Sequence, residues 1–295
     1  MTEEKRLIIN ADDFGLHEEI NWGVYEAHHK GILTSTTLIP CGNATHQAAT
    51  LAKESPNLGV GIHLTLVGGL LPILPITDIP SLVTSQGLFR NSHLSFIRDW
   101  SIGSIDKVEI ENEWSAQIEK MLALGLPITH IDSHQHLHVL PGLQDLVLKL
   151  ATKYEIPAIR IPKEPYTFFE TTPSANPIRI LSRTGLSFCA DQAKKKWEHL
   201  SSPDHFFGML TGGNMTSENW KKLLPLIPTG ISEVMTHPGR KNHILSQQFS
   251  WGYHWQEELA ALQSEEIAQW IKKNSIKLIN YRNLNSKNPI AGISS

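Results

Sequence analysis

The chain has 295 residues, 26 basic against 29 acidic side chains and a formal net charge of -3. Without a basic excess, nucleic acid and anionic membrane surfaces are poor partners, and we expect neither. Two cysteines cannot form a disulfide framework, and the residues before the first expected strand have no signal-peptide pattern, so we expect a cytoplasmic protein. No apolar run reaches the roughly 18 residues of a spanning helix, so we expect no membrane span.

The first half of the chain predicts strands that alternate with helices. Residues 7–9 form an apolar run typical of a buried parallel strand, and the run leads directly into Asp12 and Asp13. Asp is also a favoured helix N-cap, so a capping role for either acid is the alternative. The further elements expected here are a helix over 20–31, a strand over 33–39, a short helix over 44–52, a strand over 58–64, a helix over 110–122 and a strand over 128–132.

Regular periodicity fails between Thr65 and Lys107, where prolines and glycines are scattered among apolar residues. A gap of that length in a compact domain is more often a functional loop or lid than a plain connection. We therefore interpret 65–107 as a long loop insertion.

The second half of the chain resumes the alternation of strands and helices. No internal repeat or linker interrupts it, so we expect a single domain over 1–295 with an α/β fold. The expected elements are a helix over 143–154, a strand over 158–161, a less regular stretch over 163–203, a strand over 206–210, a helix near 220–224, a strand over 231–236, a helix over 259–271 and a strand over 276–279.

Carboxylate, imidazole and guanidinium groups recur at or just after the ends of five expected strands. In a curled or closed parallel sheet these ends converge on one rim, so distant residues become neighbours. One carboxylate and two imidazoles offer three metal ligands and leave a position open for water, as a catalytic site requires. A structural role is the alternative for any one of these histidines taken alone. The residues are Asp12, Asp13, His63, His134, Arg160 and His237, of which we assign Asp13, His63 and His134 to the metal.

Two more histidines follow His134 at alternate positions. His136 and His138 share a face with it if the segment stays extended. We expect them to bind substrate in the pocket or to orient other groups, with metal ligation as the alternative. Six further histidines have no such context and are expected at surface or packing positions: His17, His28, His29, His46, His93 and His199.

Five segments resemble motifs of the YdjC/ChbG family of carbohydrate deacetylases. The match runs in order from residue 7 to about 240. The segments are residues 10–15 (NADDFG), 31–37 (GILTSTT), 61–64 (GIHL), 129–138 (THIDSHQHLH) and 236–239 (THPG).

This resemblance implies a distorted (β/α) TIM-like barrel of the polysaccharide-deacetylase type, typically a homodimer. It implies an enzyme that hydrolyses the acetamide of an N-acetylated sugar, such as a chito-oligosaccharide, and releases acetate. The family's metal residues carry onto Asp13, His63 and His134. The implied metal is Mg²⁺, whereas two imidazoles with one carboxylate would favour Zn²⁺ or another transition ion.

The resemblance also implies catalytic roles. Related polysaccharide deacetylases pair a base aspartate with a ligand aspartate and use a late histidine as acid, and Asp12 and His237 resemble the base and the acid. Arg160 stands in an Arg-Ile-Pro segment that resembles the motif whose arginine orients the base. Trp251 and Trp255 are expected to bind substrate by stacking on sugar rings, with ordinary packing as the alternative.

Three alternatives stay open. Residues 68–90 resemble the hopanoid-associated branch of the family, in which the acetylated sugar sits on a lipid, so a lipid-linked N-acetylglucosamine is one alternative substrate. Another barrel metallohydrolase, such as a phosphoesterase, would use similar ligands but would want more cationic groups and usually a second metal. A non-catalytic sugar-binding protein would need neither an acid nor a base.

Overall fold

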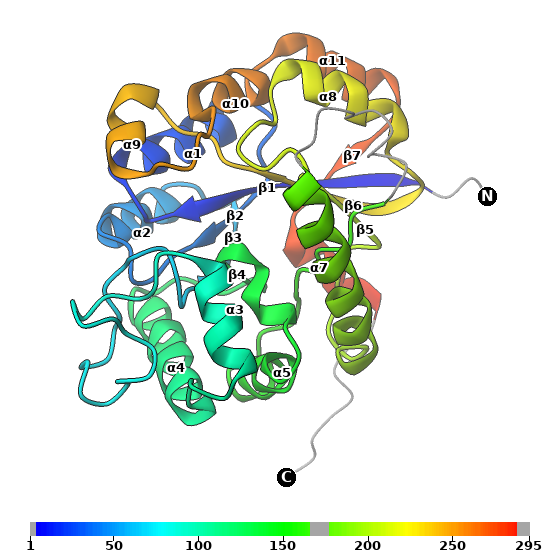
Figure 1. The fold of residues 1–295 in the computed structure, drawn as a ribbon. Helices are drawn as coiled ribbons and strands as arrows, with labels where there is room; N and C mark the ends of the chain where they lie inside the picture. Colours follow the sequence, from blue (N-terminus) through cyan, green and yellow to red (C-terminus); the bar gives the residue numbers. More distant parts are fainter. Residues whose placement is uncertain (1–3, 166–176, 288–295) are drawn as a thin grey trace.

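The structure is a computed structural model, and it describes residues 4–165 and 177–287 (Figure 1). At its centre is a curled sheet whose paired strands all run parallel, in the order β4-β3-β2-β1-β6-β5, with β7 pairing to β1. The strands are β1 (Lys5–Phe14), β2 (Ser35–Leu38), β3 (Gly59–Leu64), β4 (Ile131–Ser133), β5 (His205–Phe207), β6 (Gly230–Thr236) and β7 (Lys277–Leu278).

Isolated bridges cross the gap between β4 and β5. Ile131 pairs with Ile159, and Ala158 pairs with Ser201, so the path of the sheet continues through residues 158–159 toward β5. We predicted a full strand over 158–161, and this prediction was wrong. Prolines at 157 and 162 flank the segment, and without an N–H they cannot donate to a strand ladder. The predicted α/β fold, a distorted TIM-like barrel, is confirmed.

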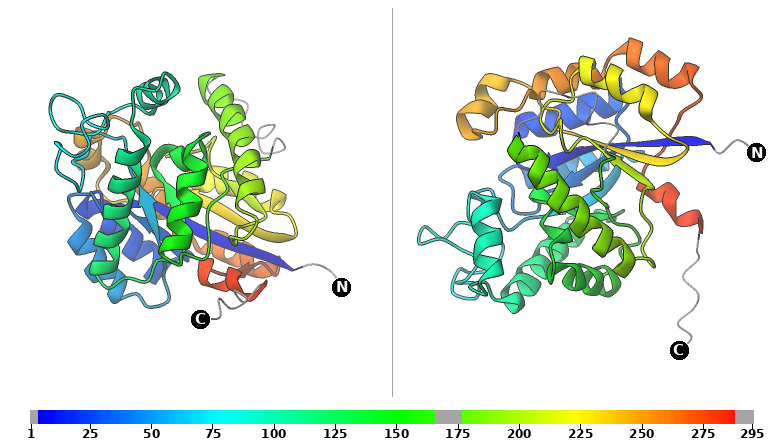
Figure 2. Two further views of the ribbon diagram at one scale, coloured as in Figure 1. Left: turned by 90° about the horizontal axis from the view of Figure 1, so that it is seen from below. Right: turned by 45° about the vertical axis from the view of Figure 1, so that its right-hand side comes forward.

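Helices surround the sheet (Figures 1 and 2). In Figure 1 the helices α1, α8, α10 and α11 lie above β1, and α3, α4, α5 and α7 lie below it. The helices are α1 (Glu18–Lys30), α2 (Thr45–Lys53), α3 (His93–Ser101), α4 (Lys107–Ala123), α5 (Leu143–Lys153), α7 (Pro177–Lys196), α8 (Ser217–Leu223), α9 (Asn242–Gln248), α10 (Trp255–Leu262) and α11 (Glu265–Lys273), with 3₁₀ segments η1 (His134–Val139), η2 (Leu224–Leu226) and η3 (Tyr281–Lys287).

Several helices differ from the prediction, and α9 was not predicted. The stretch 163–203 contains α7, whose described part buries few large apolar side chains, so its periodicity is weak in the sequence. The single helix expected over 259–271 is two helices, because the Ser264 side chain accepts the N–H of Ile267 and starts α11 anew. The insertion 65–107 contains α3, which the Ser92 hydroxyl caps.

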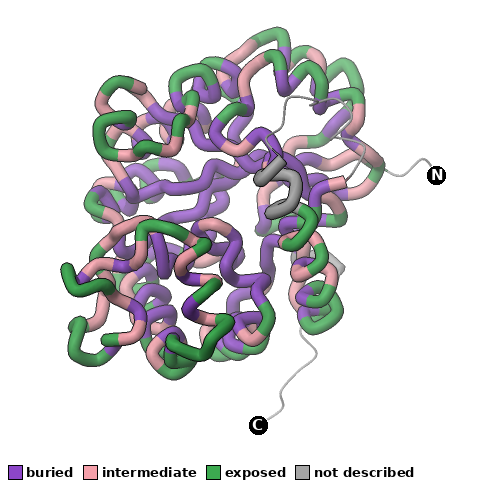
Figure 3. Tube along the Cα trace, in the orientation of Figure 1, coloured by how far each residue is buried: buried purple, intermediate pink, exposed green. Residues whose placement is uncertain are grey.

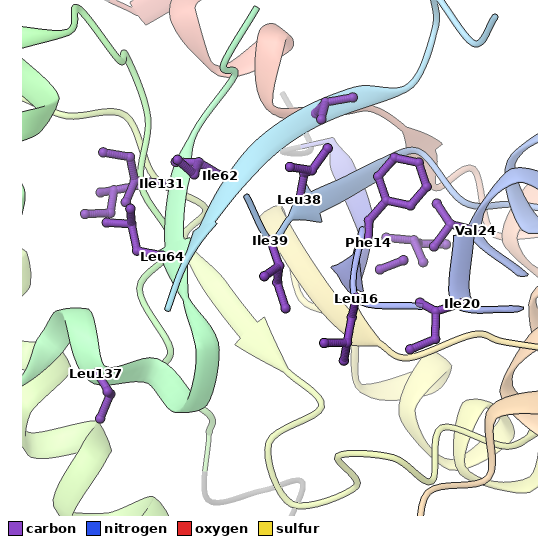
Figure 4. Packing of buried hydrophobic residues seen from close by; sticks show 14 of the residues in the cluster. Phe14, Leu16, Ile20, Val24, Leu38, Ile39, Ile62, Leu64, Ile131 and Leu137 are labelled. Atoms are coloured by element: carbon purple, nitrogen blue, oxygen red, sulfur yellow. The ribbon is translucent and has the colours of Figure 1, made fainter. Parts of the chain in front are cut away.

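The hydrophobic core lies between the sheet and the helices. Figure 3 shows the central strands almost entirely buried, while the outer sides of the helices are exposed. Phe14 at the end of β1 packs with Leu38 and Val24 in this cluster (Figure 4). The core therefore fixes the carboxyl end of β1, where the two acids lie.

Buried polar side chains of α4 hold the loop insertion in place. Glu113 accepts the N–H groups of Ile73 and Leu74, both at 3.0 Å. Gln117 accepts the N–H of Thr65 at 2.9 Å and donates to its carbonyl at 2.7 Å. The insertion is thus anchored at its start and near its residues 73–74, and it can form a wall of the site.

No helix among the described residues is long and apolar enough to cross a membrane.

Candidate active site

The end of β1 is irregular, and as a result the side chains of two neighbouring acids point into the same cavity. The register of β1 against β2 shifts between Ala11 and Phe14, and Asp13 has a φ of 65°. Side chains of a regular strand alternate between faces, and a bulge with left-handed backbone breaks that alternation. Asp12 and Asp13 consequently line the same cavity.

This cavity has a volume of about 380 Å³ and opens where the parallel strands end. Its wall brings together residues from both halves of the chain, from the insertion and from the loop before α10. The lining residues are Asp12, Asp13, His63, Gly68, Asn91, His93, Leu94, His134, Gln135, His136, Leu186, Met209, Gly212, Met235, His237, Trp251 and Tyr253.

The three residues assigned to the metal lie together where β1 and β3 end and η1 begins. The Oδ1 atom of Asp13 is 3.0 Å from Nδ1 of His134 and 3.6 Å from Nε2 of His63. All three ligand atoms lie within 4.8 Å of one another, and all three residues are buried. The cluster can therefore hold a single metal ion.

The surroundings of His63 suit a ligand role. Its Nδ1–H donates to Oδ1 of Asp132 at 2.6 Å, which directs Nε2 toward Asp13. A carboxylate behind an imidazole is the usual partner of a metal-bound histidine, because it fixes the ring orientation and raises ligand basicity. Burial lowers the pKa of His63, but Asp132 and the two β1 acids outweigh it and raise the pKa to about 9.

A strained turn directs His136 into the cavity. Gln135 and His136 both have positive φ angles, 56° and 57°, each of which costs of order 1–3 kcal/mol outside glycine. His136 lines the cavity, as predicted for a pocket residue. His138 does not: its Nδ1 contacts the Ser133 hydroxyl at 2.7 Å and its Nε2 contacts the Arg160 carbonyl at 3.1 Å. We therefore correct its expected role from substrate contact to support of the turn.

Arg160 holds Asp12 from beneath the cavity. Its Nη1 and Nη2 atoms donate to the two carboxylate oxygens of Asp12, each at 2.7 Å. The guanidinium is fully buried and also contacts Glu233 at 2.8 Å and Asp132 at 2.7 Å. Burial alone would raise the pKa of Asp12, but Arg160 outweighs it and holds that pKa well below its usual range.

His237 faces the two acids from the end of β6. Its Nδ1 accepts the N–H of Gly213 at 3.4 Å, so the ring proton of neutral His237 lies on Nε2. Burial lowers its pKa, although Asp13 and Asp12 act in the opposite direction. Its backbone N–H donates to the buried Glu258 at 2.6 Å.

Aromatic rings form one side of the cavity. The Trp251 ring lies 5.5 Å from the His134 ring, and the Tyr253 ring lies 4.8 Å from that of His237. Trp255 is only 1% exposed and does not line the cavity. We therefore correct its expected role: Trp255 is the first residue of α10 and packs in the core.

Residues 6–273 match the family model of the YdjC-like proteins. The chain belongs to the YdjC-like family. It is 34% identical over 281 residues to the carbohydrate deacetylase of Brevibacillus brevis, and the match covers 95% of this chain and 99% of the relative. It is 33% identical to the carbohydrate deacetylase of Geobacillus stearothermophilus, over 93% of this chain and 96% of the relative.

A solved structure also resembles this YdjC-like chain throughout its length. It is the crystal structure of a putative cellobiose-phosphate cleavage protein from Enterococcus faecalis V583. The TM-score is 0.79 at 30% sequence identity, and the match covers 95% of this chain and 99% of the other.

The site of this YdjC-like protein includes residues that the sequence analysis missed. His93 and Asn91 reach the cavity from the start of α3, although we expected His93 at a surface or packing position. No local pattern marks these two, because their place depends on how the insertion folds. The buried acids Asp132, Glu233 and Glu258 did leave a signal, since each interrupts an apolar strand or the apolar face of a helix.

Proposed function

We propose that this chain is a metal-dependent carbohydrate N-deacetylase that removes the acetyl group from an N-acetylated sugar and releases acetate. The observation that carries the proposal is the cluster of Asp13, His63 and His134 beside the Arg160-bound Asp12 and His237 in one cavity. The names of the similar Brevibacillus and Geobacillus proteins support the reaction and the substrate class. The proposal treats 1–295 as one domain.

One divalent cation is the cofactor in this proposal, held by Asp13, His63 and His134. An ion bound there would act as a Lewis acid that polarises the amide carbonyl and lowers the pKa of water. Mg²⁺ is the ion that the family resemblance implies, whereas the imidazole ligands favour Zn²⁺. Elemental analysis of protein purified without added metal distinguishes the two.

Asp12 acts as the general base in this reaction. It takes one proton from the water that attacks the carbonyl carbon, while Arg160 keeps the carboxylate ionised and oriented. The C–N bond then breaks, and His237 in its imidazolium form gives one proton to the leaving nitrogen, because an amine leaves poorly as an anion. The proton held by Asp12 restores His237 before the next turnover.

The walls of the cavity bind the sugar in this proposal. Trp251 and Tyr253 offer ring faces to the C–H surface of a pyranose. His93, Asn91 and His136 offer polar groups to its hydroxyls or its acetamide. Among the described residues that line the cavity there is no Lys or Arg, which disfavours a phosphoester substrate.

The proposal extends to a homodimer, which the family resemblance implies, and to a cytoplasmic location, which the use of only two cysteines favours. Light scattering coupled to size-exclusion chromatography tests the dimer, with an expected mass of twice the 33.0 kDa of one chain. Elution at the mass of one chain would contradict it.

The decisive test of the activity is acetate release from a panel of substrates. The panel contains N-acetylglucosamine, its soluble oligomers, a lipid-linked N-acetylglucosamine and a sugar phosphate. We expect acetate from at least one N-acetylated member and no phosphate release, with Asp12→Asn as the inactive control. Phosphate release without acetate would favour the phosphoesterase, and binding without either product would favour a sugar-binding protein.

A further inference from the structure

Tyr281 is a fully buried residue that the proposed reaction leaves unused. It is the first residue of η3 and lies beyond residues 6–273, which match the family model. Its side chain packs in a small apolar cluster with Ile8 of β1 and Ile231 of β6. Both of these residues lie in the amino-terminal halves of their strands, whereas the cavity opens at the carboxyl ends. Tyr281 therefore lies beneath the site.

The ring of Tyr281 is held in place by contacts that do not involve its hydroxyl group. It stacks on the ring of His130, with the centroids 3.5 Å apart and an angle of 4° between the planes. The next residue, Arg282, donates to the carbonyls of Pro56 and Leu58 at 2.7 and 2.9 Å. The segment is thus fixed to the chain before β3, and phenylalanine at 281 would keep the same packing.

The hydroxyl of Tyr281 donates to a buried carboxylate, that of Glu233, whose Oε2 lies 2.6 Å away. Burial and the nearby Glu233 hold the pKa of this hydroxyl well above its usual range, so it keeps the proton that it donates. The other oxygen of Glu233, Oε1, accepts from Nε of Arg160 at 2.9 Å and lies 2.8 Å from its Nη2. The two oxygens of Glu233 thus serve Tyr281 and Arg160 separately.

The guanidinium of Arg160 divides its donors among three buried carboxylates. Nη1 and Nη2 donate to Asp12, each at 2.7 Å, and Nη1 also lies 2.7 Å from Oδ2 of Asp132. Within the part of the chain that the structure describes, the Tyr281 hydroxyl is the one donor to Oε2 of Glu233. Without it this oxygen would be buried and unpaired, which is costly, and Glu233 would turn both oxygens toward the guanidinium. The guanidinium would then rotate away from Asp12.

We propose that Tyr281 is a positioning residue, whose hydroxyl fixes Glu233 and thereby the guanidinium of Arg160. Held in this way, the guanidinium stays aligned on Asp12. The segment beyond the family match thus supports the site from beneath. Only the kinetic part of this inference rests on the proposed function, in which Asp12 is the general base.

The test uses the full-length protein with saturating Mg²⁺ and begins with Tyr281→Phe, which removes the hydroxyl and keeps the ring. Tyr154→Phe is the matched control, because the Tyr154 hydroxyl also donates to a glutamate, Glu119, at 2.5 Å, but at an exposed position. We expect kcat of Tyr281→Phe to fall about 5- to 50-fold while KM changes little. We expect no change in Tyr154→Phe. An unchanged kcat in folded Tyr281→Phe, or an equal fall in Tyr154→Phe, would overturn the inference.

A double-mutant cycle tests whether the effect passes through Glu233. We expect Glu233→Gln to lower kcat as well, and Tyr281→Phe to add little to that loss. Independent effects multiply, so a double variant that shows the full product of the two losses would overturn the inference. If Tyr281→Phe does not fold, Glu233→Asp keeps a carboxylate that is too short to reach both partners. We expect the same loss of kcat there, and an unchanged kcat would count against the inference.

The Nε–H signal of Arg160 in ¹H–¹⁵N NMR spectra reports on the guanidinium without any turnover. Arg160→Lys removes this signal and so identifies it. We expect the signal to shift in Tyr281→Phe and to stay in place in Tyr154→Phe. An unshifted signal in folded Tyr281→Phe would overturn the inference, even if kcat fell. A wild type that releases no acetate, together with a shifted signal in Tyr281→Phe, would refute the proposed function and leave the positioning role standing.

Discussion

Arg160 donates two parallel hydrogen bonds, each of 2.7 Å, to the two carboxylate oxygens of Asp12. A planar guanidinium matches a carboxylate in this arrangement, and lysine cannot reproduce it. The pair links the floor of the barrel to the cavity, because Arg160 also contacts Glu233, and Glu233 accepts the Tyr281 hydroxyl at 2.6 Å. Asp12 is therefore held in a fixed position beside Asp13.

Arg160→Lys should lower kcat and destabilise the fold. Lysine keeps the positive charge but cannot donate the two parallel hydrogen bonds to Asp12. It also leaves other buried carboxylates without the hydrogen bonds that Arg160 donates to them. Removing one partner of a buried ion pair typically costs about 3–5 kcal/mol, and the retained charge should keep the cost below that range. Urea unfolding measures the stability, and acetate release measures kcat. A variant equal to the wild type in both would contradict the role of Arg160.

Asp12→Asn should nearly abolish turnover and keep the metal. Loss of a general base typically costs roughly 10²- to 10⁴-fold in rate. Asp13→Asn is the matched comparison, because it changes the neighbouring acid and should lower the metal content. Elemental analysis and acetate release on both variants check this. Loss of metal in Asp12→Asn instead would exchange the roles of the two acids.

Trp251→Ala should raise KM more than it lowers kcat. The indole lies in the cavity wall next to the His134 ring, and an aromatic contact is worth about 0.5–1.5 kcal/mol beyond its buried area. This corresponds to an increase in KM of roughly 2- to 10-fold. Trp270→Ala is the control, since Trp270 lies on α11 and does not line the cavity. Equal effects of the two variants would argue against a sugar contact at Trp251.

Glu258 should make the stability of the protein depend on pH. Burial raises its pKa from 4.5 to about 8, against the N–H donors of His237 and Met215, which lower it. The folded protein therefore keeps a proton that the unfolded chain loses. This contribution to the free energy of unfolding is complete below pH 4.5 and is lost as the pH rises to about 8.

Urea unfolding at about pH 5 and about pH 8 measures this dependence, whose slope from one group is at most about 1.4 kcal/mol per pH unit. Glu258→Gln should have a lower free energy of unfolding than the wild type. This difference should be larger at about pH 5 than at about pH 8. Glu257→Gln should show a pH dependence parallel to that of the wild type. A wild type and Glu258→Gln with parallel curves would contradict the raised pKa.

The sequence alone predicted that the main site residues lie close together in the fold. Asp13, His63 and His237 stand at the carboxyl ends of strands whose apolar pattern is clear, and these ends converge in a parallel barrel. His134 follows the same logic, because β4 leads directly into η1. Their metal-binding and catalytic roles stay predictions.

Other parts of the site depend on details that the pattern does not contain. The positive φ of Asp13 determines that both acids face one cavity, and a strand pattern alone would place them on opposite sides. Trp255 does not reach the cavity, because α10 begins at this residue and its ring packs in the core. His93 lines the cavity because of how the insertion folds, and Glu113 and Gln117 of α4 help to anchor that insertion.

Anomalous diffraction from a crystal grown with Mn²⁺ is the most direct test of the central claim, that one cation is shared by residues from distant parts of the chain. We predict one strong peak at bonding distance from the carboxylate of Asp13 and the imidazoles of His63 and His134. A peak at another place, or no peak at saturating Mn²⁺ and neutral pH, would contradict the account.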